Sequence, residues 1–154
     1  MSVSAVFDQN FYLTNNADIV LAISQGQFGS AIQHFDAFGG KELRAPNATF
    51  NPSYYAINNP DVLNAVASGT FANVFAHYQE FGETENRAPS NTYAAFDSDA
   101  YLEANADVAA AITAGSFTSA LDHFISFGQH ESRAGGITVT DPVTGSAFDL
   151  TTGL

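Results

Sequence analysis

One motif of aromatic and charged residues occurs three times along this chain of 154 residues. In order, the copies read HFDAFGGKELRAP (34–46), HYQEFGETENRAP (77–89) and HFISFGQHESRAG (123–135). The segments before them also match and start at Phe7, Phe50 and Phe96, about 45 residues apart. A period of this length with helical signals is typical of proteins whose helical repeats pack on their neighbours. We therefore expect an all-α fold of three tandem repeats stacked into one domain.

The predicted repeats span residues 7–49, 50–95 and 96–136, so that the helical domain covers residues 1–136. Residues 137–154 differ in composition, because β-branched residues there alternate around an Asp-Pro…Gly turn signal. This pattern predicts a short tail resembling a β-hairpin. The tail is a candidate secretion signal or assembly segment.

Each repeat is predicted to contain about three short helices. The residues expected to cap the first helix are Asp8, Asn51 and Asp97. Those expected to cap the second are Asn16, Asn59 and Asn105. The glycines expected to end the second in a left-handed conformation are Gly26, Gly69 and Gly115.

The third helix of each repeat carries the clearest apolar periodicity. In the first repeat the stripe consists of Phe28, Ala31, Ile32, Phe35 and Phe38. Spacings of three and four place these side chains on one helical face, so we expect them in the core. The glycines expected to stop this helix are Gly39, Gly82 and Gly128.

The charge of the chain restricts its partners. There are 16 Asp and Glu residues against 4 Lys and Arg, which gives a formal net charge of −12. Nucleic acids and anionic membrane surfaces are recognised through clustered Lys and Arg, so we expect neither as a partner. No stretch is apolar enough for membrane insertion. The absence of cysteine excludes disulfides and thiolate metal sites.

Three histidines recur at one repeat position: His34, His77 and His123. Their place on the flank of the stripe predicts half-buried imidazoles with a structural role, hydrogen-bonded to a neighbouring backbone group or Asn. Repeats arranged around an axis would instead allow all three to converge on one metal ion.

Three of the four cations also share one repeat position: Arg44, Arg87 and Arg133. Such placement in an acidic chain predicts a dedicated partner for each guanidinium. The candidates are the recurring carboxylates Asp18, Asp61 and Asp107, or the carbonyls at the end of the third helix. A row of anion-binding arginines is the functional alternative.

No motif for catalysis or a built-in cofactor is present. The chain lacks an EF-hand loop, a calcium β-roll nonapeptide, a phosphate loop and a nucleophile elbow. We therefore expect no catalytic residues, no cofactor and no internal metal site. Weak bridging of subunits by Ca²⁺ at the acidic surface stays open.

The motif resembles a short helical repeat of large bacterial exported and surface proteins, which often lies near haemolysin-type calcium-binding segments. The resemblance rests on Phe96 to Leu102, Asn105 to Val108 and His77 to Pro89, and it covers about residues 7–136. The third copy departs from the pattern at Gly135, where the others have Pro46 and Pro89. The resemblance brings no catalytic residues with it.

The chain is also similar to substrates of type I secretion systems, since it is acidic, free of cysteine and without a basic, apolar signal peptide at its start. This resemblance implies an uncleaved secretion signal within residues 141–154. Secretion or a cell-surface location is therefore expected, with a cytoplasmic location as the alternative.

The first functional hypothesis is an exported, non-enzymatic structural or interaction protein that self-assembles or adheres at the bacterial cell surface or in extracellular matrix. Its expected partners are further copies of the chain, as an oligomer or polymer, and surface polysaccharide. The second hypothesis is a module that binds a saccharide, haem or a metal ion in a groove between repeats. The side chains proposed to contact that ligand are the three histidines together with Tyr12, Tyr55 and Tyr101.

Overall fold

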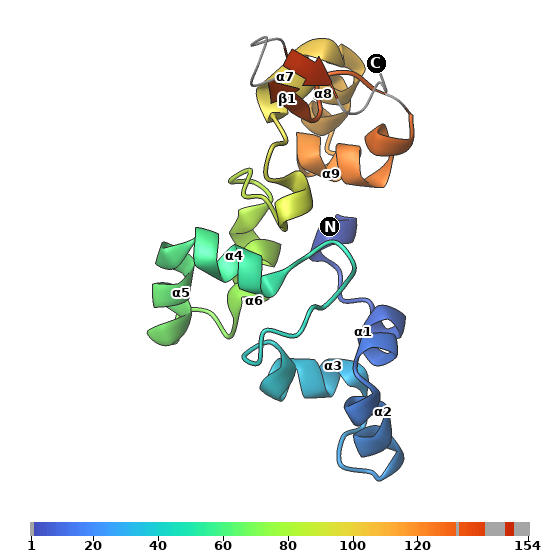
Figure 1. Ribbon diagram of the computed structural model, residues 1–154, viewed down its shortest axis with the longest axis vertical. Coiled ribbons are helices and arrows are strands. Elements are labelled where there is room, and N and C mark those ends of the chain that lie inside the picture. Colours follow the sequence, from blue (N-terminus) through green and yellow to red (C-terminus); the bar gives the residue numbers. More distant parts are fainter. Residues whose placement is uncertain (1, 132, 141–146, 150–154) are drawn as a thin grey trace.

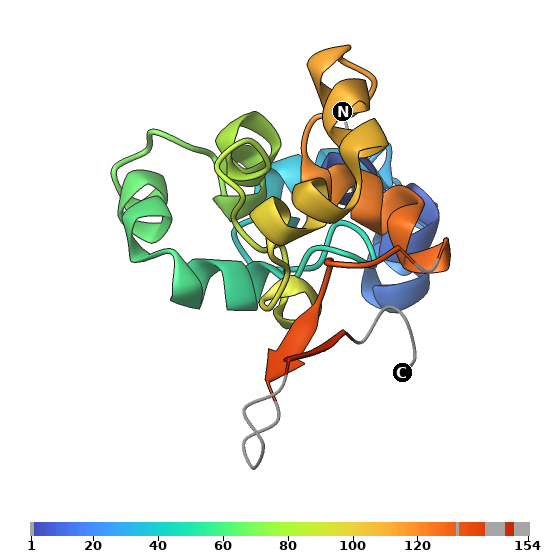
Figure 2. The same cartoon turned by 90° about the horizontal axis from the view of Figure 1, so that it is seen from above.

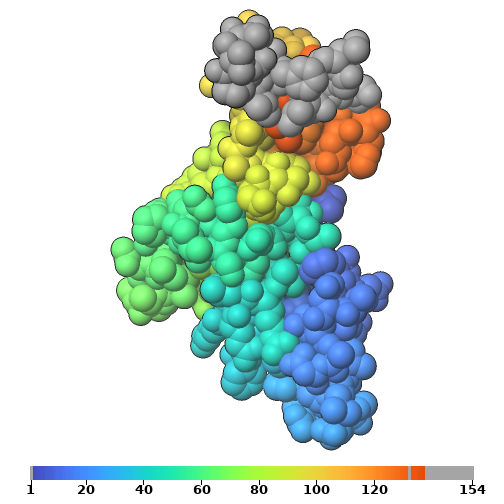
Figure 3. All heavy atoms as spheres, viewed as in Figure 1, coloured from blue at the N-terminus to red at the C-terminus, as the bar shows by residue number. Residues whose placement is uncertain are grey.

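The computed structural model describes residues 2–131, 133–140 and 147–149. These residues are mostly helical, which confirms the prediction of an all-α class. Three groups of helices follow one another along the long axis of the molecule: α1 to α3, α4 to α6 and α7 to α9 (Figures 1 and 3).

The same order of elements recurs in the three groups. The first contains α1 (Gln9–Asn15), α2 (Ala17–Ser24), α3 (Ala31–His34) and the π-helical turn η2 (Phe35–Gly39). The second contains α4 (Pro52–Asn58), α5 (Pro60–Ala67), α6 (Val74–His77) and the π-helical turn η3 (Tyr78–Gly82). The third contains α7 (Ser98–Ala104), α8 (Ala106–Thr113), α9 (Ala120–Ser126) and the 3₁₀ turn η5 (Gly128–His130).

A backbone hydrogen bond joins the start of each group to its end. The N–H of Asp8 donates to the carbonyl of Pro46 at 2.9 Å, and the N–H of Asn51 donates to that of Pro89 at the same distance. The third group is closed at 3.1 Å between Asp97 and Gly136. We call the closed segments unit 1 (7–46), unit 2 (50–89) and unit 3 (96–136). Residues 47–49 link the first two units, and residues 90–95, which include the 3₁₀ turn η4 (Asn91–Tyr93), link the last two.

The predicted caps of the first helices are confirmed. The side chain of Asp8 accepts from the N–H of Phe11, and Asn51 and Asp97 make the equivalent bonds in units 2 and 3. The prediction for the second helices is only partly right. Asn16 stands at the N-cap position, but its side chain forms no capping bond, because its amide donates to the carbonyl of Tyr12 and its oxygen accepts from Arg44.

The expected glycine ends hold for the second helix, and for the third helix they hold in position only, in units 1 and 2. Gly26, Gly69 and Gly115 have φ of 74°, 81° and 77°, the left-handed conformation that glycine tolerates best. Gly39 and Gly82 are the last residues of the π turns but are not left-handed, and the left-handed residues that follow are Leu43 and Asn86.

Space, and not the backbone conformation, requires glycine at positions 39, 82 and 128. A Cβ on Gly39 would collide with the hydroxyl of Tyr12, and a Cβ on Gly82 or Gly128 would likewise collide with the tyrosine hydroxyl of its own unit. The third helix therefore needs glycine for the close approach of a tyrosine, which the helix-stop prediction did not foresee.

The apolar stripe of the third helix is only partly buried. Ala31 and Phe35 are in the core, but Phe38 is 52% exposed and Ile32 is 39% exposed. Phe81 and Phe127, the equivalents of Phe38, are 41% and 50% exposed. The prediction of a fully buried stripe is therefore wrong, because the last aromatic residue turns outward in every unit, both where the helix widens into a π turn and in unit 3, where it does not.

The buried apolar side chains form two clusters. The larger one joins units 1 and 2, where the rings of Phe35 and Phe75 meet edge to face at 5.9 Å. The smaller one lies within unit 3, around Tyr101, Leu121 and Phe124.

The two ends of the chain meet unit 3 in different ways. At the start, the 3₁₀ turn η1 (Val3–Ala5) lies beside α9, as two perpendicular views show (Figures 1 and 2). At the other end, Ile137 forms an antiparallel bridge with Phe96, and β1 (Thr138–Thr140) pairs antiparallel with β2 (Ala147–Asp149). The expected Asp-Pro…Gly turn lies outside the described residues.

Candidate functional site

Each recurring arginine forms hydrogen bonds with the recurring aspartate of its own unit. In unit 1, the guanidinium of Arg44 donates two hydrogen bonds to Asp18, at 3.0 and 2.8 Å, and a third to the side-chain oxygen of Asn16 at 2.7 Å. Its Nε donates to Glu42 at 2.7 Å. The guanidinium thereby ties the end of its unit to the start of α2, and it does not bind the carbonyls that end the third helix.

Units 2 and 3 build the same joint. Arg87 donates to Asp61, Asn59 and Glu85, and Arg133 donates to Asp107, Asn105 and Glu131. We call these three clusters the arginine joints. The hydrogen bond from each arginine lowers the pKa of its aspartate below the ordinary value.

The recurring histidines meet the recurring tyrosines. The hydroxyls of Tyr12, Tyr55 and Tyr101 lie 2.9, 3.0 and 2.9 Å from Nδ1 of His34, His77 and His123, respectively. The predicted partner, a backbone group or Asn, is therefore wrong for Nδ1, because tyrosine fills that place in every unit. The tyrosines are fully buried, so they present no hydroxyl to a ligand in a groove between units.

Burial controls the ionisation of these pairs. It raises the pKa of Tyr12 and Tyr101 to about 12 and that of Tyr55 further in the same direction. It also lowers the pKa of His77 and His123, because the charged imidazolium is disfavoured in an apolar setting. The pairs of units 2 and 3 thus stay neutral near pH 7, which suits a structural contact.

Each histidine also joins an aromatic cluster that reaches the surface. In unit 1, the ring of His34 lies 4.8 Å from Phe28 and 6.0 Å from the half-exposed Phe38. The equivalent clusters of units 2 and 3 are Phe71, His77 and Phe81, and Phe117, His123 and Phe127. We call them the aromatic clusters.

The three histidines do not form a common site. Each contacts the tyrosine and phenylalanines of its own unit. Within the described ranges no group of three or more His, Asp or Glu side chains is placed to hold one metal ion.

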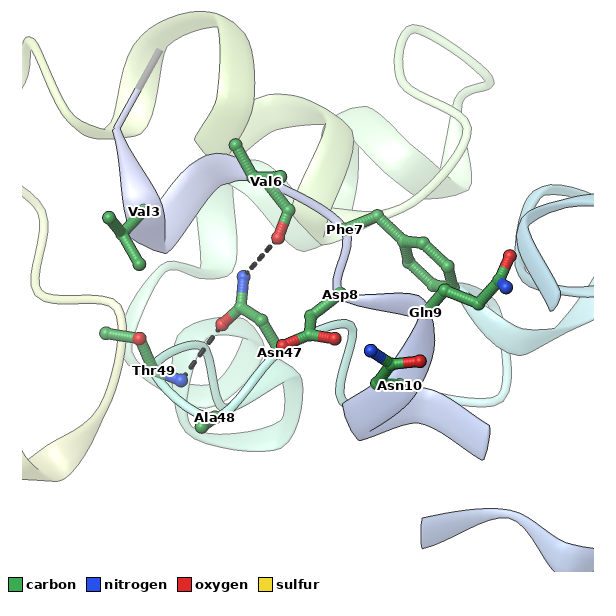
Figure 4. Close-up of a pocket in the computed structure, with 9 residues that line it drawn as sticks. All are labelled: Val3, Val6, Phe7, Asp8, Gln9, Asn10, Asn47, Ala48 and Thr49. Carbon is green, nitrogen blue, oxygen red and sulfur yellow. Dashed lines mark hydrogen bonds between the residues drawn. The ribbon is translucent and has the colours of Figure 1, made fainter. Parts of the chain in front are cut away.

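A surface groove lies elsewhere, between the start of the chain, the first residues of α1 and the link between units 1 and 2 (Figure 4). Its volume is about 570 Å³. Val3 and Thr49 stand on one side, and Asp8 and Asn10 stand on the other. Asn47 ties the walls together, since its amide donates to the carbonyl of Val6 and its oxygen accepts from the N–H of Thr49.

Neither this groove nor the buried polar residues Ser4 and Glu83 are indicated by the recurring motif. These positions escape a search for recurring residues because the three copies differ there: the equivalents of Glu83 are Gly40 and Gln129. An alignment of the copies read for its exceptions would have found Glu83.

Comparison with known proteins adds no identification. No protein-family model matches the chain, and neither curated proteins nor solved structures give a significant match. In the part of the chain that the structure describes, every helix is too short or too polar to cross a membrane.

Proposed function

We propose that the chain is a non-enzymatic structural or interaction protein that associates with further copies of itself at a bacterial cell surface or in extracellular matrix. In this proposal the three units are tandem repeats stacked into one domain, and residues 137–154 form a hairpin-like tail that serves in assembly or carries the signal for type I secretion. The repeat is the one of exported bacterial proteins that the sequence resembles.

The observation that carries this proposal is the recurrence of the aromatic clusters. Phe38, Phe81 and Phe127 are each about half exposed, at the same place in each unit. A soluble protein exposes single apolar residues without consequence, but recurring exposed aromatic residues are typical of contact surfaces. The polar residues that recur beside them are bound within their own units, in the arginine joints and the tyrosine–histidine pairs.

The size of the aromatic contacts favours association at several units. A phenylalanine buries about 150–250 Å² when covered, so a half-exposed ring still offers about 100 Å². At about 25 cal/mol per Å² its burial contributes about 2.5 kcal/mol, which is less than the cost of about 4–15 kcal/mol for joining two molecules. One cluster is therefore too small, whereas a lattice that covers clusters on several units reaches the required range.

Charge opposes this association and provides a way to control it. The net charge is −12, and three of the four cations are already bound to carboxylates. At physiological ionic strength, salt largely screens the repulsion between charges of neighbouring copies that lie more than about 8 Å apart. We expect Ca²⁺ to act more strongly than that, by bridging carboxylates of neighbouring copies.

Size-exclusion chromatography with light scattering tests the proposal. The chain is measured at high concentration in dilute buffer, in NaCl, in MgCl₂ and in CaCl₂ at matched ionic strength. We expect larger assemblies in salt and the largest in CaCl₂. The triple variant Phe38→Ser, Phe81→Ser, Phe127→Ser should stay monomeric, and Ile57→Ser, at a residue 78% exposed outside the clusters, is the control. A strict monomer under all conditions would refute the proposal.

Export is tested separately. An ABC exporter and its adaptor encoded beside the chain would support type I secretion, and secretion of a reporter fused to residues 137–154 through that exporter would establish the signal. Failure of the reporter to leave the cell while the full chain does so would place the signal elsewhere.

The groove of Figure 4 favours a second candidate, a module that binds a neutral saccharide. The apolar Val6 and Phe7 and the polar Asp8 and Asn10 line the same hollow, a mixture that suits a sugar ring and its hydroxyls. Titration with neutral oligosaccharides, followed by NMR, should shift the signals of these residues. Asp8 also caps α1, so Asn10→Ala is the variant to test for loss of binding.

A further inference from the structure

The N-terminal arm, residues 2–6, is held by several parts of the molecule. The amide of Asn47 donates to the carbonyl of Ser4 at 2.9 Å, and the amide of Gln79 in η3 donates to the carbonyl of Ala5 at 2.8 Å. On its other side the arm contacts α9 of unit 3 (Figures 1 and 2). Ser2, Ser4 and Ala5 are buried there. The arm therefore joins unit 2 to unit 3.

A carboxylate lies at the centre of this contact. The hydroxyl of Ser4 donates to Oε1 of Glu83 at 2.7 Å, and the hydroxyl of Tyr78 donates to that of Ser4 at 3.1 Å. The hydroxyl of Ser2 lies 2.7 Å from that of Ser4. Glu83 is only 5% exposed, and among the described residues no cation forms an ion pair with it. A buried carboxylate without a cation is costly when ionised.

Some groups around Glu83 favour its ionised form and others disfavour it. From α9, the carboxylate of Asp122, 7% exposed, repels an ionised Glu83. The oxygens of Asp122 are themselves bound by the N–H of Thr118 and, at 3.5 Å, by the hydroxyl of Ser126. From the arm, the hydrogen bond of Ser4 favours ionisation. From η3, Tyr78 is a neutral phenol, because burial raises its pKa.

Loss of hydration is the largest of these effects, so the pKa of Glu83 is raised above its ordinary value of 4.5. The hydrogen bond from Ser4 survives protonation, since the carbonyl oxygen of a neutral carboxyl group still accepts. Protonation thus removes the repulsion by Asp122 and the cost of burial without breaking the contact to the arm.

We propose that the N-terminal arm is a proton-operated clasp between units 2 and 3, which tightens when Glu83 takes up a proton and loosens when Glu83 is ionised. A carboxyl group with a raised pKa in the closed state favours closure as the pH falls through that pKa, and the gain is complete below the pKa of the open state, near 4.5. At neutral pH the arm opens more often, and unit 3, which has its own apolar cluster, is held less firmly.

Hydrogen exchange of the full chain, measured by mass spectrometry between pH 7 and pH 4.5 and corrected for the intrinsic rate, tests the clasp. The N–H of Ala5 donates to the carbonyl of Ser2, so its exchange reports opening of the arm. We expect its protection to rise as the pH falls, by about tenfold for each unit by which the pKa of the closed state exceeds that of the open state. Glu83→Gln, which keeps the acceptor for Ser4, should be protected at pH 7 and nearly independent of pH.

The exposed residue Glu80, in the same turn, provides the control. Glu80→Gln removes the same charge and should keep the pH dependence of the unaltered chain. Equal pH dependence of the unaltered chain and Glu83→Gln, within about twofold, would overturn the proposal. Should Glu83→Gln fail to fold, the carboxyl signal of Glu83 in the unaltered chain is titrated by NMR, and a pKa at or below 4.5 would overturn it as well.

Discussion

Replacement of Arg87 by methionine tests whether an arginine joint stabilises the unit that contains it. Methionine keeps the length of the aliphatic stem but removes the bonds to Asp61, Asn59 and Glu85. The pair with Asp61 is partly solvated, with side-chain exposures of 24% and 60%, so its contribution is about 0.5–1 kcal/mol. The bond to the part-buried Asn59 contributes about 1 kcal/mol more, which brings the loss to about 2 kcal/mol.

A loss of about 2 kcal/mol lowers the melting temperature by about 4–8 °C in a protein of this size. Calorimetry of Arg87→Met measures it, and the exposed cation Lys41, replaced by methionine, shows the general cost of removing a positive charge from an acidic chain. The melting temperature of Arg87→Lys should lie between those of Arg87→Met and the Lys41 variant, because an ammonium group cannot make the bidentate contact.

The dependence on pH identifies the source of the effect. The pKa of Asp61 is lowered in the folded chain by Arg87, so the stability that this carboxylate contributes is present above its unfolded pKa of 3.8 and is lost as the pH falls through the folded value. The difference between the unaltered chain and Arg87→Met should therefore shrink in strong acid. A melting temperature of Arg87→Met equal to that of the Lys41 variant would refute the structural role of the joint.

Three further predictions concern the tyrosine–histidine pairs and the glycines. Tyr55→Phe leaves Nδ1 of His77 buried without its partner and should cost about 1–3 kcal/mol in urea unfolding, whereas an unchanged midpoint would contradict the contact. Gly82→Ala should destabilise more than Gly69→Ala, since the first collides with Tyr55 while the second meets only the strain of a φ of 81°, and the reverse order of melting temperatures would count against this reasoning. Because burial raises the pKa of Tyr12 from 10.0 to about 12, the free energy of unfolding should fall as the pH rises from 10 toward 12. A melting temperature, followed by circular dichroism, that stays constant over this range would disprove it.

The helical class and the caps follow from local sequence, which is why they could be predicted. Asp8 and Asn51 bind the N–H three residues ahead, a contact that involves no distant part of the chain. Gly69 ends its helix for an equally local reason. Recurrence identified the residues of the arginine joints but left two partners open for each arginine, and only the folded chain places Arg44 on Asp18.

What the sequence did not predict depends on contacts between distant residues. Gly39 is predicted only as a helix stop. The close approach of the Tyr12 hydroxyl, which leaves no room for a Cβ at position 39, can be seen only in the folded chain. The exposure of Phe38 could not be predicted either, since a periodicity of three and four marks one face of a helix and not how far along the helix that face is covered. Glu83 is buried by an arm that lies nearly eighty residues earlier in the chain, so no local pattern could indicate it.

The bond that closes each unit has a consequence for how such a chain can change in evolution. The backbone nitrogen of Asp8 lies 2.9 Å from the carbonyl oxygen of Pro46, and the same distance joins Asn51 to Pro89. The chain therefore begins and ends each of these units at nearly the same point. An in-frame gene duplication of one unit would then lengthen the array, and a deletion would shorten it, while the bond that closes each remaining unit is kept. Array length is thus a property that mutation can alter in whole steps.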